Sequence, residues 1–321
     1  TYLGLDLPGA PRNILLTDAG NGKLKLAWET PEAGANGGYC DPSNLTYNIY
    51  AVANGYAVEF KNGIRGNEIE FIDQDYYAAE QFPKYYGISA SNSAGEGSIY
   101  RSSEVMVGQP YSYPFNESWK SGNATHDGWY RMSNGEKGWE PAANYSSDND
   151  NGCMAFEAFK DGDLSYLALG KVNVAYASNP KLIFDYYAVP GADMYLLPEI
   201  NLAYNGNYAT ADVIQFASLG GESGWRKVVL DIAPYTQDRT YISVRFLGKG
   251  SALYPLRIDN VRVMDSDETP NSGFSGLGEI TSDCDGPVKY YDINGLEVTN
   301  PQKGSIYIVR SASGKVFKTV W

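Results

Sequence analysis

Short apolar runs separated by turn residues recur along the whole chain of 321 residues. Examples are KLKLAWE (23–29), LTYNIYAV (45–52), PKLIFDYYAV (180–189) and LRIDNVRV (256–263). Side chains alternate between faces in a strand, whereas a helix would need an apolar stripe of longer period, and no window carries one. The 27 Tyr and 35 Gly favour strands and tight turns. The sequence therefore predicts an all-β protein, and its length predicts more than one domain.

The chain carries a formal net charge of −13. Binding to nucleic acid requires clustered Lys and Arg, so we predict no nucleic-acid partner. No apolar run approaches the roughly 18 residues of a membrane-spanning helix, so we also predict no membrane insertion. Acidic, Asn-rich loops suit hard cations such as calcium. The cysteines Cys40, Cys153 and Cys284 show neither a disulfide framework nor zinc-ligand spacing.

Turn-rich and polar stretches divide the chain into candidate domains. Residues 1–7 are interpreted as the last strand of an upstream domain, because a strand-like start runs directly into Pro-Gly-Ala-Pro. Two β domains follow, at 8–109 and 110–265. Residues 266–279 are polar and Gly/Ser-rich and are predicted to be a linker, and residues 280–321 a small C-terminal β domain.

The segments PGAPRNILLT, LKLAWETP, LTYNIYAV and YYGISASNSAGEGS together resemble a fibronectin type III domain. The resemblance implies a β-sandwich in which Trp28 is buried on the second strand and Tyr47 and Ile49 lie on the next core strand. The chain departs from the family at the corner tyrosine, where it has Lys84, and this puts the corner hydrogen bond in doubt.

The segments PFNESW, LIFDYY, KVVLDIAPY, ISVRF and RIDNVRV, in this order and spacing, are similar to MAM-like jelly rolls and to the cleaved-adhesin domains of gingipains. The tail, with YYDINGLEV and GSIYIVR, resembles the C-terminal sorting domain of the type IX secretion system in Bacteroidetes. Together the three resemblances imply an adhesin-like surface or secreted Bacteroidetes protein. They imply an extracellular or outer-membrane-surface location.

Asp259 and Asn260 interrupt the apolar strand RIDNVRV. Strict alternation places Asp259 on one face with Val261 and Val263, and Asn260 on the other with Leu256. A carboxylate on an apolar face is costly unless it is paired or coordinates a metal ion. The pattern therefore marks Asp259 as a candidate functional residue.

The jelly-roll resemblance implies a structural calcium ion that ties an early strand, a nearby loop and the last strand together. Its candidate ligands here are Glu117 in FNESW, Asp148 and Asp150 in SDNDNG, and Asp259. Alternate acidic residues followed by Gly allow a tight loop to direct several oxygens inward. The alternatives are that Asp259 pairs with an arginine or caps backbone amides; the arginines considered are Arg131, Arg245 and Arg257.

Aromatic side chains suggest a ligand surface as well. Sugars stack on exposed aromatic faces, and Tyr204, Tyr208 and Tyr254 are the candidates for such a platform. The tryptophans Trp119, Trp129 and Trp139 match core positions of the family pattern, so they are predicted to be buried.

Enzyme signatures are sparse. His126 is the one histidine, so any Ser–His–Asp or Cys–His arrangement would need it, and HExxH and phosphate-loop motifs are absent. The sequence does not decide whether two carboxylates lie at the separation that glycoside hydrolysis requires, because that separation is a property of the fold. We therefore predict a non-catalytic, monomeric binding protein, whose jelly roll recognises a glycan or a host or matrix protein and holds structural calcium. Two alternatives are the non-catalytic accessory region of a larger secreted peptidase or glycoside hydrolase, and a ligand-free structural spacer.

Overall fold

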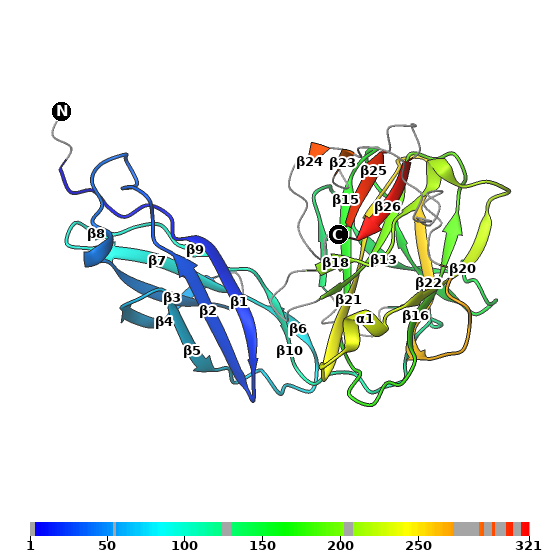
Figure 1. Ribbon diagram of the computed structural model, residues 1–321, viewed down its shortest axis with the longest axis horizontal. Helices are drawn as coiled ribbons and strands as arrows, with labels where there is room; N and C mark the ends of the chain where they lie inside the picture. Colours follow the sequence, from blue (N-terminus) through cyan, green and yellow to red (C-terminus); the bar gives the residue numbers. More distant parts are fainter. Residues whose placement is uncertain are drawn as a thin grey trace. The chain divides into compact units, whose positions relative to one another are not determined.

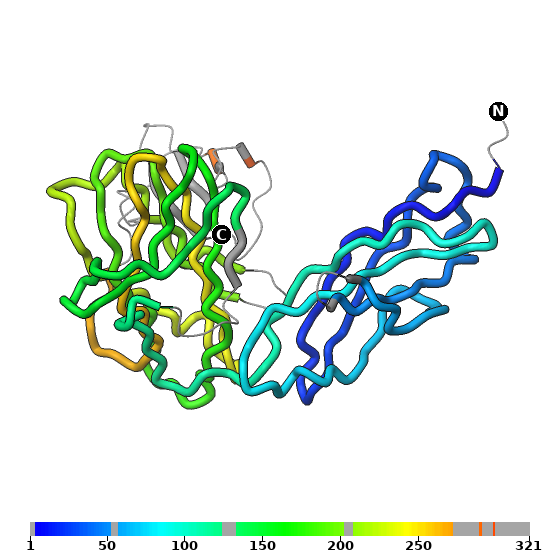
Figure 2. Tube along the Cα trace, turned by 180° about the vertical axis from the view of Figure 1, so that it is seen from behind, coloured from blue at the N-terminus to red at the C-terminus, as the bar shows by residue number. Residues whose placement is uncertain are grey.

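The computed structural model describes residues 4–53, 56–123, 130–201 and 208–271, together with the strand segments 289–291, 297–298, 306–310 and 316–320. The chain divides into two compact units, one of residues 1–110 with 201–207 and one of residues 111–200 with 208–321. Strands form nearly all of the regular structure (Figure 1). The Cα trace runs back and forth in extended segments within each unit (Figure 2). In the described part of the chain, the helical segments are α1 (Ala233–Thr236) and two 3-10 turns. The predicted all-β class is confirmed.

The first unit contains two main antiparallel sheets. One has the order β1-β2-β5, and the other has the order β4-β3-β7-β8, with β9 also paired to β7. Their bounds are β1 Arg12–Gly20, β2 Lys23–Glu29, β3 Thr46–Ala53, β4 Tyr56–Ile64, β5 Glu68–Ile72, β7 Tyr86–Asn92, β8 Gly95–Glu96 and β9 Tyr100–Arg101. Two further strands, β6 (Phe82–Lys84) and β10 (Val105–Val107), pair with each other.

The core of this unit is formed by the alternate residues that the sequence pattern places inward. Trp28, Tyr47, Ile49 and Ile88 are buried, and the Trp28 and Tyr47 rings lie 5.0 Å apart. Burial of such side chains is the main stabilising contribution to a small β-sandwich. The predicted core positions are confirmed; the assignment to the fibronectin type III family stays a prediction.

Lys84, which replaces the expected corner tyrosine, forms ion pairs instead. Its Nζ lies 2.7 Å from Asp73 Oδ2 and 2.6 Å from Asp75 Oδ2. The hydroxyl of Tyr86 donates a hydrogen bond of 2.6 Å to the same Asp73 carboxylate. The corner of this sandwich is therefore fixed by a buried carboxylate that binds one lysine and one tyrosine.

The second unit contains two six-stranded sheets. One has the order β13-β14-β22-β16-β20, with β11 paired to β22, and the other has the order β12-β15-β21-β17-β18, with β19 paired to β17. The bounds in the first sheet are β11 Phe115–Glu117, β13 Trp139–Ala143, β14 Gly152–Phe156, β16 Pro180–Ala188, β20 Gly224–Asp231 and β22 Leu256–Asp265. Those in the second are β12 Tyr130–Ser133, β15 Leu164–Asn173, β17 Tyr195–Asn201, β18 Tyr208–Thr210, β19 Ile214–Gln215 and β21 Tyr241–Lys249.

The C-terminal strands form a four-stranded antiparallel sheet of their own. Its order is β24-β23-β25-β26. The bounds are β23 Lys289–Tyr291, β24 Glu297–Val298, β25 Ile306–Arg310 and β26 Val316–Val320. The segment predicted as a linker, 266–279, is described only to residue 271.

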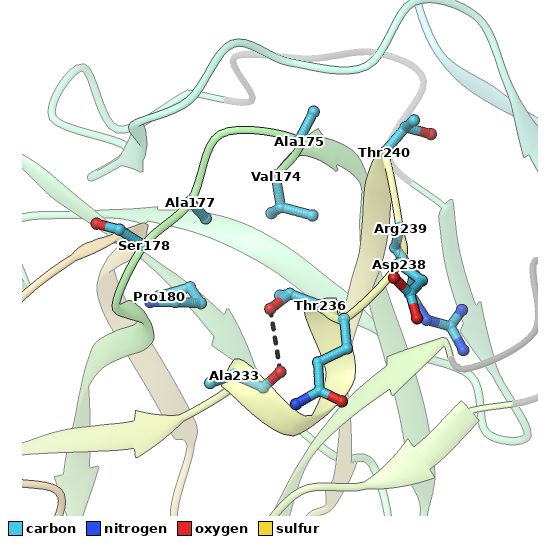
Figure 3. A pocket seen from close by; sticks show the side chains of 11 residues that line it. Val174, Ala175, Ala177, Ser178, Pro180, Ala233, Thr236, Asp238, Arg239 and Thr240 are labelled. Atoms are coloured by element: carbon cyan, nitrogen blue, oxygen red, sulfur yellow. Dashed lines mark hydrogen bonds between the residues drawn. The ribbon is translucent and has the colours of Figure 1, made fainter.

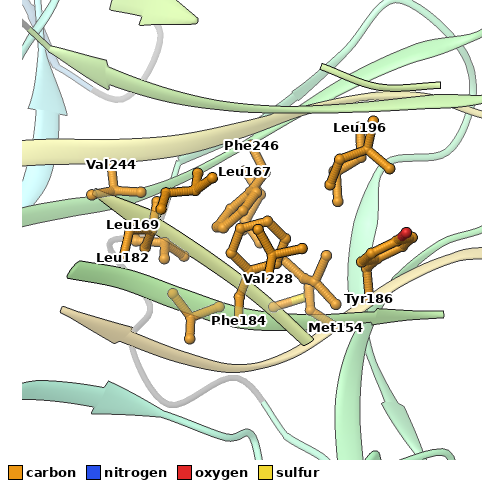
Figure 4. Packing of buried hydrophobic residues seen from close by; sticks show 14 of the residues in the cluster. Met154, Leu167, Leu169, Leu182, Phe184, Tyr186, Leu196, Val228, Val244 and Phe246 are labelled. Atoms are coloured by element: carbon orange, nitrogen blue, oxygen red, sulfur yellow. The ribbon is translucent and has the colours of Figure 1, made fainter. Parts of the chain in front are cut away.

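The core of the second unit lies between its two large sheets. Phe184 of β16 and Phe246 of β21 meet edge to face with ring centroids 5.0 Å apart. Figure 4 shows leucine and valine side chains from both sheets around this pair. Trp119 and Trp139 are fully buried, as predicted, whereas Trp129 lies outside the described residues.

A β-bulge in β22 changes the predicted faces of that strand. Asp185 of β16 pairs with Asp259, but Ile183 pairs with Arg262, so Phe184 alone faces two residues of β22. Asn260 takes a left-handed φ of 50° at this point. The extra residue reverses the alternation. Leu256, Ile258, Val261 and Val263 consequently all enter one core, and the predicted placement of Asp259 beside Val261 and Val263 was wrong.

Candidate metal centre

The loop that connects β13 to β14, residues 144–151, covers the bulge of β22. The backbone amide of Ser147 donates to Asp259 Oδ2 at 2.8 Å. The side-chain amide of Asn260 donates to Ser147 Oγ at 2.9 Å and to Asp148 Oδ2 at 3.1 Å. These contacts explain how Asp259 is fully buried although it points away from the hydrophobic core.

Three carboxylates meet where this loop lies on the strand. One oxygen each from Asp148, Asp150 and Asp259 can be chosen so that all three lie within 4.8 Å of one another. Asp148 is exposed, Asp150 is half-buried and Asp259 is fully buried. We call these three residues the carboxylate cluster. Three oxygen donors in one place provide the ligand chemistry that calcium prefers.

Glu117, the fourth predicted ligand, is not part of the cluster. It is buried on β11 opposite Val261, and its Oε1 accepts a 2.6 Å hydrogen bond from the backbone amide of Trp119. Sequence reasoning also missed Asp185, which lies opposite Asp259 and accepts a 2.7 Å hydrogen bond from the Ser147 hydroxyl. The sequence could have indicated Asp185, because it is a second isolated acidic residue within an apolar strand, LIFDYY.

Burial disfavours the charged form of Asp259. Desolvation raises the pKa of Asp259 to about 6, against the lowering effect of hydrogen bonds from the amides of Ser147 and Asn260. No lysine or arginine is among the groups that stabilise its charge in the described part of the chain. The structure therefore contains the alternative in which Asp259 caps backbone amides. An additional cation would offset the remaining cost of the buried charge.

The arginines considered as partners of Asp259 have other contacts. Arg245 donates from Nε to Glu199 at 2.6 Å. The guanidinium of Arg257 lies 4.4 Å from the Tyr145 ring centroid and 5.6 Å from that of Tyr187. The side chain of Arg131 lies outside the described residues.

Replacing Asn260 tests the strained bulge. Asn260→Ala should cost about 1–3 kcal/mol, because alanine is disfavoured by about 1–2 kcal/mol in the left-handed region and cannot make the amide hydrogen bonds to the loop. Asn260→Gly should recover about 1 kcal/mol of that cost, since glycine keeps the backbone but not the hydrogen bonds. Urea unfolding in chelator measures both values. Equal losses of unfolding free energy in the two variants would show that the left-handed φ angle of Asn260 contributes nothing to the cost.

The tyrosines predicted as a sugar platform lie in different surroundings. Tyr208 is half-buried, and the Arg245 guanidinium lies 4.0 Å from its ring centroid. Tyr254 is 45% exposed on the loop before β22. Tyr204 lies outside the described residues. The two described tyrosines thus come from different elements, Tyr208 from β18 and Tyr254 from the loop before β22.

The histidine and the cysteines are the side chains best suited to nucleophilic catalysis. His126 lies outside the described residues. Cys40 and Cys153 are buried free thiols, and burial raises the pKa of Cys153 to about 12. Thiolate is the reactive form, so Cys153 is poorly suited to act as a nucleophile at neutral pH.

Among the described helices, none is long and apolar enough to cross a membrane. No protein-family model matches the chain, and no curated protein does so either.

Solved structures to which this chain is similar include the K1 cleaved adhesin domain of Lys-gingipain from Porphyromonas gingivalis W83. It is 19% identical over 48% of this chain and 98% of that chain, with a TM-score of 0.36. A carbohydrate-binding module of the β-sandwich superfamily is 9% identical over 80% of this chain and 99% of that chain, also with a TM-score of 0.36. The module TmCBM61, solved in complex with β-1,4-galactotriose, is 14% identical over 46% of this chain and 94% of that chain, with a TM-score of 0.35.

Proposed function

We propose that this chain is a non-catalytic, adhesin-like glycan-binding protein that acts outside the cell or on the outer-membrane surface. In this proposal the two six-stranded sheets of the second unit, which we call the jelly-roll unit, recognise the glycan, and a calcium ion in the carboxylate cluster fixes the loop 144–151 on β22. The fibronectin type III-like unit serves as a spacer, the C-terminal strands belong to a sorting-like domain, and the protein acts as a monomer.

The observation that carries the proposal is the buried Asp259 in the carboxylate cluster. A fully buried carboxylate that lacks a cationic partner among the described residues, with two further carboxylates beside it, is suited to a divalent cation. Calcium usually takes six to eight oxygens, so three carboxylates supplemented by loop oxygens or water suggest a moderate affinity. Such a site would fill at the millimolar calcium levels that suit extracellular modules.

The charge of the chain and the composition of its surface, rather than the carboxylate cluster, support the proposal that the ligand is a glycan. A net charge of −13 disfavours nucleic acid and other polyanions. The surface of the jelly-roll unit combines exposed aromatic rings with uncharged hydrogen-bonding groups, among them Tyr176 and Thr240. Neutral sugars use both kinds of group.

A glycan array probed with the full chain, once in calcium and once in chelator, tests the function. We expect selective binding in calcium and at least about a tenfold weaker signal in chelator, because the loop loses its fixed position. Asp259→Asn should bind weakly in both solutions. Binding that is equal in calcium and chelator would remove calcium from the proposal. If the chain binds no glycan on the array and captures a matrix protein instead, the glycan proposal is overturned in favour of a protein ligand.

A further inference from the structure

An open pocket lies at one end of the jelly-roll unit. The turn that follows β15 and the segment from α1 to the start of β21 enclose a volume of about 610 Å³ (Figure 3). Small apolar residues, including Val174, Ala177 and Pro180, line one part of it. Gln237, Asp238 and Thr240 supply polar side chains from the other segment. The volume lies within the range of ordinary small-molecule sites.

Hydrogen bonds hold both walls of this pocket in place. The carboxylate of Asp265, at the end of β22, accepts from the Ser178 amide at 2.9 Å, the Ser178 hydroxyl at 2.8 Å and the Asn179 amide at 2.7 Å. The Val174 amide donates to the Thr240 carbonyl at 2.9 Å, which joins the two walls. The Thr236 hydroxyl donates to the Ala233 carbonyl at 3.1 Å, drawn as the dashed line in Figure 3. The site is therefore built in advance of any ligand, which reduces the entropic cost of binding.

The polar lining indicates which ligand chemistry fits. Within the described residues, the side chains of Gln237, Asp238 and Thr240 make no hydrogen bond to the protein. They offer an amide, a carboxylate and a hydroxyl, so both donors and acceptors are available. Asp238 and Arg239 are the charged residues of the lining and have opposite signs.

This lining discriminates between ligand classes. Asp238 and Arg239 carry opposite charges, so the lining offers no net electrostatic attraction to an anionic or a cationic ligand. An apolar ligand would desolvate the free polar groups without replacing their hydrogen bonds to water. A neutral polyhydroxylated ring can bond to the free groups and lay its C–H face on the small apolar side chains.

The turn that follows β15 also carries an exposed aromatic ring. Tyr176, between the lining residues Ala175 and Ala177, is 93% exposed, the highest value among the large exposed hydrophobic residues described. Elsewhere on this unit the rings of Tyr145 and Tyr187 contact Arg257, and that of Tyr208 contacts Arg245. Tyr176 therefore combines an accessible ring with a neighbouring pocket.

We propose that this pocket binds a neutral saccharide, with one sugar ring between the two walls and Tyr176 stacking on the ring or on its neighbour. The inference rests on the proposed glycan-binding function and gives it a place and a ligand class. Gln237, Asp238 and Thr240 bond to the sugar hydroxyls. The pocket gives uronate- and sulfate-bearing rings no net electrostatic advantage, so neutral rings bind preferentially.

The experiment compares variants of the full chain, in calcium, on an array of neutral hexose and N-acetylhexosamine oligosaccharides and their uronate- and sulfate-bearing counterparts. The best neutral oligosaccharide is then titrated calorimetrically. Tyr176→Ala and Asp238→Asn should each weaken binding at least about tenfold, the size expected when a central contact is removed. Asparagine tolerates the left-handed φ of 57° at position 238, and Tyr176 is too exposed to affect folding. Phe159→Ala, an exposed aromatic on another loop, is the matched control and should bind as the wild type does.

The possible outcomes separate this inference from the function on which it rests. Absence of binding to every glycan overturns both. Tight glycan binding that survives Tyr176→Ala and Asp238→Asn overturns the pocket alone, and loss in Tyr254→Ala would then place the site on the loop before β22. Binding restricted to uronate- or sulfate-bearing glycans overturns the neutral ligand class.

Discussion

Calcium should raise the melting temperature of the wild-type chain, and Asp259→Asn should abolish that increase. An ion bound only by the folded state, at one hundred times its dissociation constant, contributes about 2.7 kcal/mol. For a unit of this size, that corresponds to an increase of roughly 5–10 °C. The variant removes the buried charge of the carboxylate cluster and keeps the shape of the side chain. Differential scanning calorimetry in calcium and in chelator measures the effect.

The control for this prediction is Glu157→Gln, which removes an exposed acid outside the cluster. Glu157 is 65% exposed, and its ion pair with Lys137 has a separation of 3.8 Å. Exposed pairs of this kind contribute about 0–1 kcal/mol, so the calcium-dependent increase should remain. The prediction fails if the wild type melts at the same temperature in calcium and in chelator, provided that elemental analysis shows that the chelated sample is free of metal.

Asp259 also gives the metal-free protein a characteristic pH dependence. Its pKa is raised from 3.8 to about 6 in the folded state by burial. The folded state therefore binds the proton more tightly than the unfolded chain, and the resulting stability is complete below about pH 4. It should be lost as the pH rises through about 6, by about 3 kcal/mol in all. Asp259→Asn should lack this loss, and calcium, which binds the ionised carboxylate, should reverse it in the wild type.

Asp73→Ala should destabilise the first unit by about 3–5 kcal/mol. The Asp73 side chain is completely inaccessible, and its carboxylate binds Lys84 Nζ at 2.7 Å and the Tyr86 hydroxyl at 2.6 Å. Removing Asp73 leaves the buried Tyr86 hydroxyl without its acceptor and the Lys84 ammonium with less compensation for its charge. Here the ammonium of Lys84, whose side chain is only 16% exposed, would keep Asp75 as its remaining partner.

Asp75→Ala is the matched control, because it removes the other carboxylate at the same lysine. The Asp75 side chain is 37% exposed, so its loss should cost about 1 kcal/mol or less. Hydrogen exchange of the amides in β2 and β7, followed by mass spectrometry, reports the stability of this unit in the full chain. Equal acceleration of exchange in the two variants would contradict the assignment of Asp73 as the buried anchor.

The sequence by itself determined the β class and much of the core. Alternation is a local property of the strand backbone, so Trp28 and Ile49 could be placed inside before any tertiary contact was known. The acidic loop with Asp148 and Asp150 was also recognisable, because its composition alone favours oxygen ligation. These inferences depend on residues that are close together in the chain.

Only the tertiary structure decided the rest. A single extra residue in β22 moved Val261 and Val263 to the core face and left Asp259 on the face that the loop 144–151 covers. Alternation cannot reveal a bulge, because a bulge depends on pairing with β16. The same packing left Glu117 outside the carboxylate cluster and brought Asp185 opposite Asp259. The pocket beside Tyr176 joins two segments about sixty residues apart, and side chains that distant meet only when the sheets have packed.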